Sequence, residues 1–191
     1  QRDGLRFYVK KNRSFNLCNC LGISYRWMSE KDNGQSHAIN KGISLMAGNY
    51  FAWLNSDDYY IDSDVFSKVF DFFNAHPRSD MIYGRGYCVD EHKVVFRDFH
   101  DNCTTLSFSR RILKHECFIL QPSVFIRSRV VRETGPIDES LNWRMDWDYW
   151  LRIAEKHTIT FFPHWVAHWR QHKGIKSFNF CKETLDERES V

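Results

Sequence analysis

The sequence predicts an α/β domain, in which strands alternate with helices along the chain. Two observations carry this prediction. Short apolar segments of strand type recur between segments whose apolar residues follow the helical period, and no internal repeat or linker interrupts the series. The 191 residues are enough for one domain with a substantial hydrophobic core. We therefore expect a sheet flanked by helices.

Strands are expected where short apolar segments are bounded by polar or turn residues. The segment 49–55 is apolar on both faces, as is typical of a central strand in a covered sheet. The segment 87–97 predicts two short strands around a polar turn at 90–93. The complete set of expected strands is 23–29, 50–54, 80–84, two within 87–97, 121–127 and 158–163.

Helices are expected where apolar residues recur every three or four positions. The first has Ser36 as its possible N-cap and Gly48 as its terminator, and an acidic cluster at 62–64 precedes the second. A brief third helix is bounded by Ser128 and Gly135. The apolar stripes lie within 38–46, 65–73, 128–134 and 146–156.

The composition excludes several classes of protein. With 42% hydrophobic and 16% aromatic residues the chain is too apolar for disorder, and no apolar run approaches the roughly 20 residues of a membrane span. The net charge of +3 comes from dispersed basic residues, so no nucleic-acid partner is expected. The six cysteines show no zinc-ligand spacing, which favours reduced thiols in a cytoplasmic protein.

Two adjacent carboxylates follow the strand expected at 50–54. In "NSDD", Asp57 and Asp58 come with Asn55 and Ser56, and these oxygen-bearing side chains suit Mg²⁺ or Mn²⁺. In a parallel α/β sheet, ligands bind beyond the carboxyl ends of the strands, where these acids are expected. The residues alone leave a second interpretation open, in which one of the acids caps the next helix.

Two further polar clusters stand later in the chain. In "MDWD", Asp146 and Asp148 lie at an expected helix N-terminus, where the helix dipole favours ionised carboxylates, and Asp146 could equally be the N-cap. In "HWRQHKGIKS", imidazole and cationic side chains occur together, which fits a metal or phosphate oxygens but also a solvated basic loop.

Taken together, three segments resemble the signature regions of family 2 glycosyltransferases with the GT-A fold. They are 29–60, 121–154 and 166–177, and the resemblance covers about residues 24–177. It implies a GT-A (Rossmann-like) fold, with a mixed, mainly parallel sheet flanked by helices. The enzymes of closest character build lipopolysaccharide, capsule or other surface glycans in bacteria.

The resemblance also assigns roles to matching positions. "NSDD" resembles the DxD motif with Asn55 in its first place, so Asp57 and Asp58 are the expected ligands of Mg²⁺ or Mn²⁺. "MDWD" resembles the acidic motif that supplies the catalytic base, which makes Asp146 the candidate, with Met145 in place of the usual Glu. The remaining candidates are His172 for the metal or diphosphate, Lys176 for the phosphates, Asp58 also for the donor, and Asp32, Gln35 and Lys41 for the nucleotide pocket.

The implied reaction is an inverting, metal-dependent transfer of a sugar from a nucleoside-diphosphate sugar to a hydroxyl of a glycan or lipid-linked acceptor. The implied setting is the cytoplasm, with peripheral association at the inner face of the membrane. Two alternatives remain open at this point: an inactive remnant of the same fold that acts in binding or assembly, and a metal-dependent phosphohydrolase that uses the same carboxylates.

The N-terminal segment departs from the family pattern. Family members normally open with two strands whose loops hold the nucleobase and ribose, and residues 1–22 contain nothing similar. We therefore expect a divergent or truncated segment at 1–22, a GT-A domain lacking its first βα units at 23–177, and a C-terminal tail at 178–191.

Overall fold

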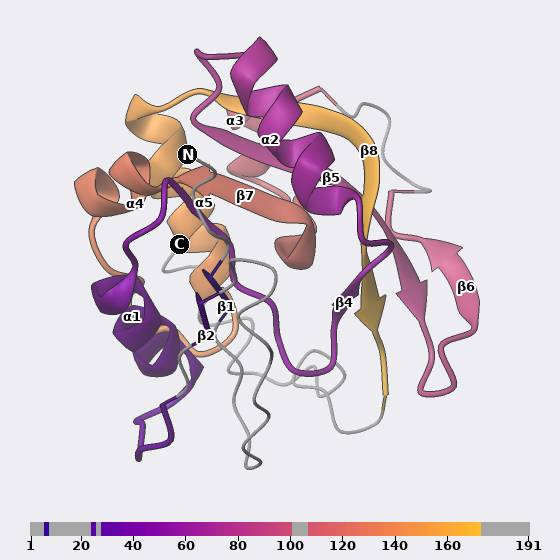
Figure 1. Cartoon of the computed structure of the whole chain (residues 1–191), viewed down its shortest axis with the longest axis horizontal. Helices are drawn as coiled ribbons and strands as arrows, with labels where there is room; N and C mark the ends of the chain where they lie inside the picture. Colours follow the sequence, from indigo (N-terminus) through magenta and orange to yellow (C-terminus); the bar gives the residue numbers. More distant parts are fainter. Residues whose placement is uncertain (1–5, 8–23, 26–27, 101–106, 173–191) are drawn as a thin grey trace.

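A computed structural model describes residues 6–7, 24–25, 28–100 and 107–172 of the chain (Figure 1). It is a mixed α/β structure with one six-stranded sheet and a separate pair of two-residue strands. The elements in chain order are β1 Arg6–Phe7, β2 Ser24–Tyr25, α1 Gln35–Leu45, β3 Tyr50–Phe51, β4 Tyr59–Tyr60, α2 Val65–Ala75, β5 Met81–Val89, β6 Val95–Asp98, α3 Arg110–Leu113, the 3-10 helix Gln121–Ser123, β7 Val124–Arg127, α4 Ser128–Thr134, α5 Met145–Lys156 and β8 Ile159–Arg170.

The six-stranded sheet runs in the order β3-β7-β5-β8-β4, and β6 pairs with β5. The predicted mixed sheet is confirmed, but its parallel share is smaller than expected. In the described part of this sheet only the β5–β8 pair is parallel, while β3–β7, β5–β7, β5–β6 and β4–β8 are antiparallel. An apolar run indicates that both faces of a strand are buried, but it does not indicate whether the neighbouring strands are parallel or antiparallel. The sequence pattern therefore could not show that most pairs in this sheet are antiparallel.

Two strands differ in length from the expectation because strands extend only as far as their ladder partners. β3 keeps two residues of the expected 50–54, since β7 is its only ladder partner among the strands that the structure describes. β8 continues well past Pro163 because β5 accompanies it on one side and β4 on the other. The register of β5 and β8 shifts near this proline, as expected for a residue without a backbone N–H. The predicted hairpin within 87–97 is confirmed as β5, its turn and β6.

The expected helices are present, with small differences at their ends. α2 buries Val65, Val69 and Phe73, as its apolar stripe predicts. α1 begins two residues earlier than expected, with Gly34 and not Ser36 as its N-cap, because the Ser36 hydroxyl bonds elsewhere. None of the described helices combines the length and the apolar composition that crossing a bilayer requires.

The hydrophobic core forms two clusters. The larger one joins α4 and α5 to β5 and β7 around the fully buried side chains of Tyr149 and Trp150. The smaller one packs α2 against β5, β7 and β8 around Phe73 and Phe162. Helices therefore pack on the sheet through both clusters, and the loop between β3 and β4 leaves the sheet while the loop before α5 connects α4 to α5.

We expect Gly86→Ala to lower the free energy of unfolding by about 2 kcal/mol, because overpacking a close strand contact forces the backbone apart. A Cβ at position 86 would lie 2.6 Å from the carbonyl oxygen of Ala167 on β8 and would also meet Leu120. Urea unfolding measures the change. Gly42→Ala in α1 is the control: a Cβ there meets nothing within 4 Å, so we expect a gain of about 0.5–1 kcal/mol. Equal stability of Gly86→Ala and wild type would contradict the close β5–β8 packing.

Candidate active site

A network of side-chain amides lies at the loop between β3 and β4. Asn55 Oδ1 accepts a hydrogen bond of 2.9 Å from Gln35 Nε2, and Asn55 Nδ2 donates to Gln121 Oε1 at 3.0 Å. Gln121 Nε2 in turn donates to the carbonyl of Trp53 at 2.8 Å. The network therefore ties the first residue of α1 and the 3-10 helix before β7 to the loop that carries the two predicted acids.

Asp58 is buried beside this network. Its Oδ1 accepts a hydrogen bond of 3.1 Å from the backbone N–H of Arg170, and its Oδ2 accepts one of 3.3 Å from Asn55 Nδ2. Burial raises the pKa of Asp58 to about 7, the charge of Asp57 adds to the rise, and the hydrogen bonds with Arg170 and Asn55 oppose it. The carboxylate would gain from any cation that replaces its lost hydration.

Asp57 faces the imidazole of His172, which follows the end of β8. Asp57 Oδ2 lies 3.5 Å from His172 Nε2, and both side chains are 34% exposed. Neither Asp57 nor Asp58 caps α2, because the N-cap of that helix is Asp64 and Asp62 accepts the backbone N–H of Asp64. The capping interpretation of "NSDD" is thus wrong, and the structure brings two of the predicted metal ligands face to face.

The donor set fits a divalent cation in part. An outward carboxylate and an imidazole are ligands that Mn²⁺ accepts, and Asp57 and His172 present both at one place. Asp58 lies beside them with both oxygens engaged by N–H groups. Within 28–100 and 107–172, no three His, Cys, Asp or Glu side chains form a metal-binding group. Asp57 and His172 could thus supply two ligands to an ion, and other oxygens would have to complete its shell.

Asp146 lies in the first turn of α5. Its Oδ1 accepts a hydrogen bond of 2.8 Å from the N–H of Trp147, and the N-cap of the helix is Arg144, so Asp146 is not the capping residue. The side chain keeps some exposure, yet the dense packing around the carboxylate raises its pKa above the usual range, against the smaller opposing effects of hydrogen bonds and Arg144. A carboxylate with a raised pKa is suited to accept a proton.

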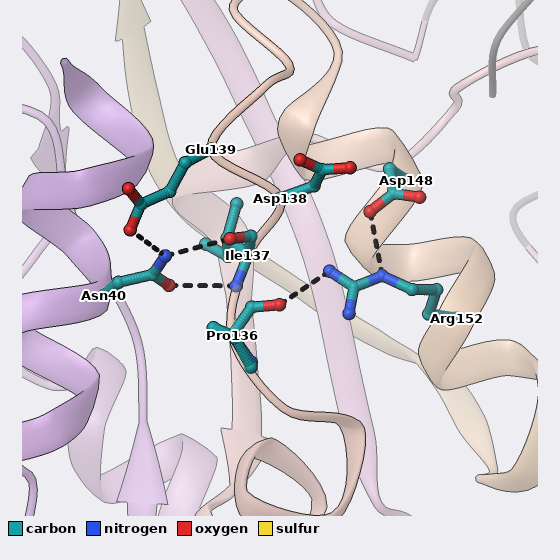
Figure 2. A pocket seen from close by; sticks show the side chains of 7 residues that line it. All are labelled: Asn40, Pro136, Ile137, Asp138, Glu139, Asp148 and Arg152. Carbon is teal, nitrogen blue, oxygen red and sulfur yellow. Dashed lines mark hydrogen bonds and ion pairs between the residues drawn. The ribbon is translucent and has the colours of Figure 1, made fainter. Parts of the chain in front are cut away.

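Asp148 is engaged differently from Asp146. Its Oδ2 accepts a hydrogen bond of 2.8 Å from Arg152 Nε, and Arg152 also donates to the carbonyls of Thr134 and Pro136. This pair lines an open pocket of about 430 Å³. Figure 2 shows the lining side chains, with Asp148 and Arg152 joined by a hydrogen bond. Asn40 on α1 completes the arrangement through hydrogen bonds with both the N–H and the carbonyl of Ile137. These polar groups fix the segment that leads into α5, and thereby position Asp146.

The start of α1 connects the two acidic centres. Ser36 Oγ donates to the carbonyl of Leu141 at 3.2 Å and lies 2.8 Å from the sulfur of Met145, the residue before Asp146. The preceding residue, Gln35, bonds to Asn55 in the amide network. The base candidate and the loop of Asp57 and Asp58 are therefore attached to the same helical turn. Met145, which replaces the usual Glu, has a packing role here and is buried.

The weaker sequence candidates have mixed outcomes. Gln35 lies in the amide network, as described above. Lys41 is turned toward Glu30, at 2.7 Å, and the carbonyl of Lys31. Asp32 accepts a hydrogen bond from the N–H of Gly34 just before α1. Lys176 lies outside the described residues.

Sequence reasoning missed Gln121 and Trp53. The sequence pattern predicts only a strand over 121–127, although a polar residue directly before Pro122 and a buried strand is a recognisable signal of a strand-end position. Trp53 carries the carbonyl that Gln121 binds, and its ring stacks on Trp150 with the centroids 5.2 Å apart. The Trp53–Trp150 stack thus links the "NSDD" loop to the helix of Asp146.

Curated relatives of the chain are glycosyltransferases. An uncharacterized glycosyltransferase of Rickettsia typhi is 25% identical over 190 residues, which cover 95% of this chain and 58% of the relative. A PGL/p-HBAD biosynthesis glycosyltransferase of Mycobacterium bovis is 24% identical over 159 residues, which cover 82% of this chain and 58% of the relative. The chain thus spans a little over half the length of these relatives.

Solved structures with the same fold are also glycosyltransferases. S. aureus TarS 1–349 in complex with UDP-GlcNAc matches with a TM-score of 0.62 at 16% identity, over 84% of this chain and 46% of TarS. The mannosyltransferase PcManGT of Pyrobaculum calidifontis, in complex with GDP-Man and Mn²⁺, matches with a TM-score of 0.57 at 13% identity. The match covers 83% of this chain and 42% of PcManGT. These likenesses confirm the predicted GT-A type of fold.

A match to a protein-family model confirms the family that the sequence motifs predicted. The model described as "Glycosyltransferase like family 2" matches residues 10–181, which is most of the chain. The chain belongs to the family 2 glycosyltransferases.

Proposed function

We propose that the chain is the sugar-transferring domain of an inverting glycosyltransferase. It would move a sugar from a nucleoside-diphosphate sugar to an acceptor hydroxyl in the synthesis of a cell-surface polysaccharide or lipopolysaccharide. The observation that carries the proposal is the attachment of two acidic centres to one helical turn: the Asp57–His172 pair beside the amide network, and Asp146 at the start of α5.

The donor half of the proposed site is the loop between β3 and β4. Asp57 and His172 would hold Mg²⁺ or Mn²⁺, which when bound stabilises the negative charge of the departing nucleoside diphosphate. Asp58 adds a buried negative charge next to the ion, and the Asn55 network keeps the loop in place. The structural neighbours in complex with UDP-GlcNAc and with GDP-Man and Mn²⁺ support a nucleotide-sugar donor.

The acceptor half of the proposed site is Asp146. As a carboxylate it would take the proton of the acceptor hydroxyl while that oxygen attacks the anomeric carbon from the face opposite the leaving diphosphate. Loss of hydration around this carboxylate makes it a stronger base than an exposed aspartate. Because the diphosphate leaves from the other face, the configuration at the anomeric carbon inverts.

We place the reaction in the cytoplasm, at the inner face of the membrane, where a lipid-linked or growing glycan acceptor is accessible. The relative named as a PGL/p-HBAD biosynthesis glycosyltransferase supports a role in the biosynthesis of a glycosylated product. Because the chain covers 58% of that relative, acceptor choice by the whole protein is part of the proposal.

We expect the metal dependence of donor binding to reside in Asp57 and His172. In calorimetric titrations with UDP and GDP, Mn²⁺ should strengthen nucleotide binding to the wild type. Asp57→Asn and His172→Gln should each weaken the Mn²⁺-dependent part by at least about tenfold, because a ligand to the ion is lost. Asp71→Asn, an exposed aspartate on α2, is the matched control and should behave as the wild type. Nucleotide binding that ignores Mn²⁺ would contradict the role given to this pair.

A further inference from the structure

The amide network beside Asp58 has a fixed direction, and Gln121 sets it. The carbonyl of Trp53 can only accept a hydrogen bond, so the Gln121 side chain turns its Nε2 toward that carbonyl, at 2.8 Å. Gln121 Oε1 is thereby left to accept a hydrogen bond of 3.0 Å from Asn55 Nδ2. This contact orients the Asn55 amide in turn, and its oxygen accepts a hydrogen bond of 2.9 Å from Gln35 Nε2.

The other end of the network requires the same direction. Asn55 Nδ2 also donates to Asp58 Oδ2 at 3.3 Å, and an ionised carboxylate can only accept. The Gln121 oxygen and the Asp58 carboxylate therefore use the two hydrogens of one NH₂ group. Asp58 Oδ1 accepts a hydrogen bond of 3.1 Å from the backbone N–H of Arg170, just at the end of β8. Both Asp58 oxygens are thus directed at N–H donors within the protein.

Gln121 can fix this direction because its backbone and its partner are both held by the core. It begins the 3-10 helix before β7, and Ser123 at the end of that helix is fully buried. The Ser123 hydroxyl lies 2.9 Å from the carbonyl oxygen of Gly84 on β5. Trp53, whose carbonyl Gln121 binds, stacks on the buried ring of Trp150. The orientation of the amides is therefore set from the core outward to the "NSDD" loop.

An acid at position 55 would not fit this direction. A carboxylate has no hydrogens to donate, so it would meet Gln121 Oε1 and Asp58 Oδ2 as a third acceptor, where Asn55 now donates at 3.0 and 3.3 Å. The contact with Asp58 would also bring two like charges together. The network thus gives a physical reason for an amide, in place of the usual Asp, at the first position of the motif.

We propose that Gln121 is a positioning residue of the donor site. By fixing the direction of the Asn55 amide, it holds Asp58 toward the end of β8 and leaves Asp57 to meet the ion. Gln121 contacts neither the ion nor the donor and acts only through Asn55. The effect on binding rests on the proposed metal-dependent donor site, whereas the orientation of the Asn55 amide does not depend on that site.

The first test follows the Asn55 amide by ¹H–¹⁵N NMR of the metal-free full chain. The side-chain NH₂ signals of Asn55 are identified as those that are missing in Asn55→Leu. In Gln121→Met, which keeps the length of the side chain but has no amide, these signals should shift and exchange faster with water, because one hydrogen loses its acceptor. Asn55 signals that are unchanged in Gln121→Met would overturn the proposal.

Asn55→Asp tests the direction of the network without any metal or nucleotide. We expect its melting temperature to lie about 5 °C below that of Asn74→Asp, because only the first change places a carboxylate against two acceptors. Asn74 is the matched control, an exposed Asn on α2. Equal melting temperatures would show that position 55 tolerates an acid, which contradicts a network of fixed direction.

Calorimetric titrations with UDP and GDP test the effect of Gln121 on the donor site. Gln121→Met should weaken the Mn²⁺-dependent part of nucleotide binding about fivefold at a temperature well below melting. In an Asn55→Leu background the same change should cost nothing further, because Gln121 acts through Asn55. Losses that multiply instead would show two independent structural effects and reject the positioning role. Wild-type binding that ignores Mn²⁺ would reject the proposed donor site, while the NMR signals and melting temperatures still decide whether Gln121 orients Asn55.

Discussion

Asp146→Asn should reduce sugar transfer by about 10²–10⁴-fold while leaving donor binding unchanged, because a general base is lost and nothing that contacts the nucleotide is altered. Asn is nearly isosteric, and its oxygen can still accept the hydrogen bond from the N–H of Trp147. The raised pKa of Asp146 gives a second signature. Transfer by the wild type should fall as the pH drops through a value above the usual aspartate range, since protonation removes the base. Initial rates against pH, with calorimetric UDP binding at each pH, measure both effects.

Asp148→Asn is the control for this experiment. Asp148 lies two residues further along α5 and accepts a hydrogen bond from Arg152 Nε. An Asn oxygen can still accept that bond and keep Arg152 in place, so the change should cost little transfer and at most about 1 kcal/mol of stability. Retained turnover in Asp146→Asn, together with a large loss in Asp148→Asn, would move the base to Asp148. Loss of UDP binding in Asp146→Asn would show instead that the residue supports the donor site.

The sequence predicted the elements whose pattern is local. The helical stripes of α2 and α5 are confirmed because each presents one apolar face to a core cluster, and that face repeats every three or four residues. The lengths of β3 and β8 were not predictable in this way. They depend on the strands that pair with them, and those partners lie far away in the chain.

The candidate site shows the same division. The types of side chain in "NSDD" and "MDWD" indicated their chemistry, and the family resemblance indicated which of them belong together. The residues that hold these side chains and set their pKa values could not be predicted, because a pKa depends on neighbours in space. Asp58 is held by the N–H of Arg170, and Asn55 by Gln121, contacts that no spacing in the sequence reveals.

The buried carboxylate of Asp58 should make the metal-free protein less stable as the pH rises. Its pKa is about 7 in the folded chain against 3.8 for an unperturbed aspartate. Below pH 4 the group is protonated in both states and costs nothing. Between pH 4 and 7 it ionises in the unfolded chain first, so the free energy of unfolding falls, by at most about 4 kcal/mol in total. Above pH 7 this loss is complete and constant.

Asp58→Asn lacks the buried charge, so its stability relative to the wild type should grow by up to about 4 kcal/mol between pH 4 and 8. Urea unfolding with a chelator present measures the difference. Asp57→Asn removes the neighbouring charge but leaves Asp58 buried. Burial is the larger cause of the raised pKa of Asp58, so Asp57→Asn should recover only a smaller part of the lost stability. Mn²⁺ should reverse the sign of the wild-type trend if it binds beside Asp58, because a cation favours the ionised carboxylate. Parallel pH profiles for the wild type and Asp58→Asn would show that the carboxylate is well solvated, and would remove the physical reason for placing a cation next to it.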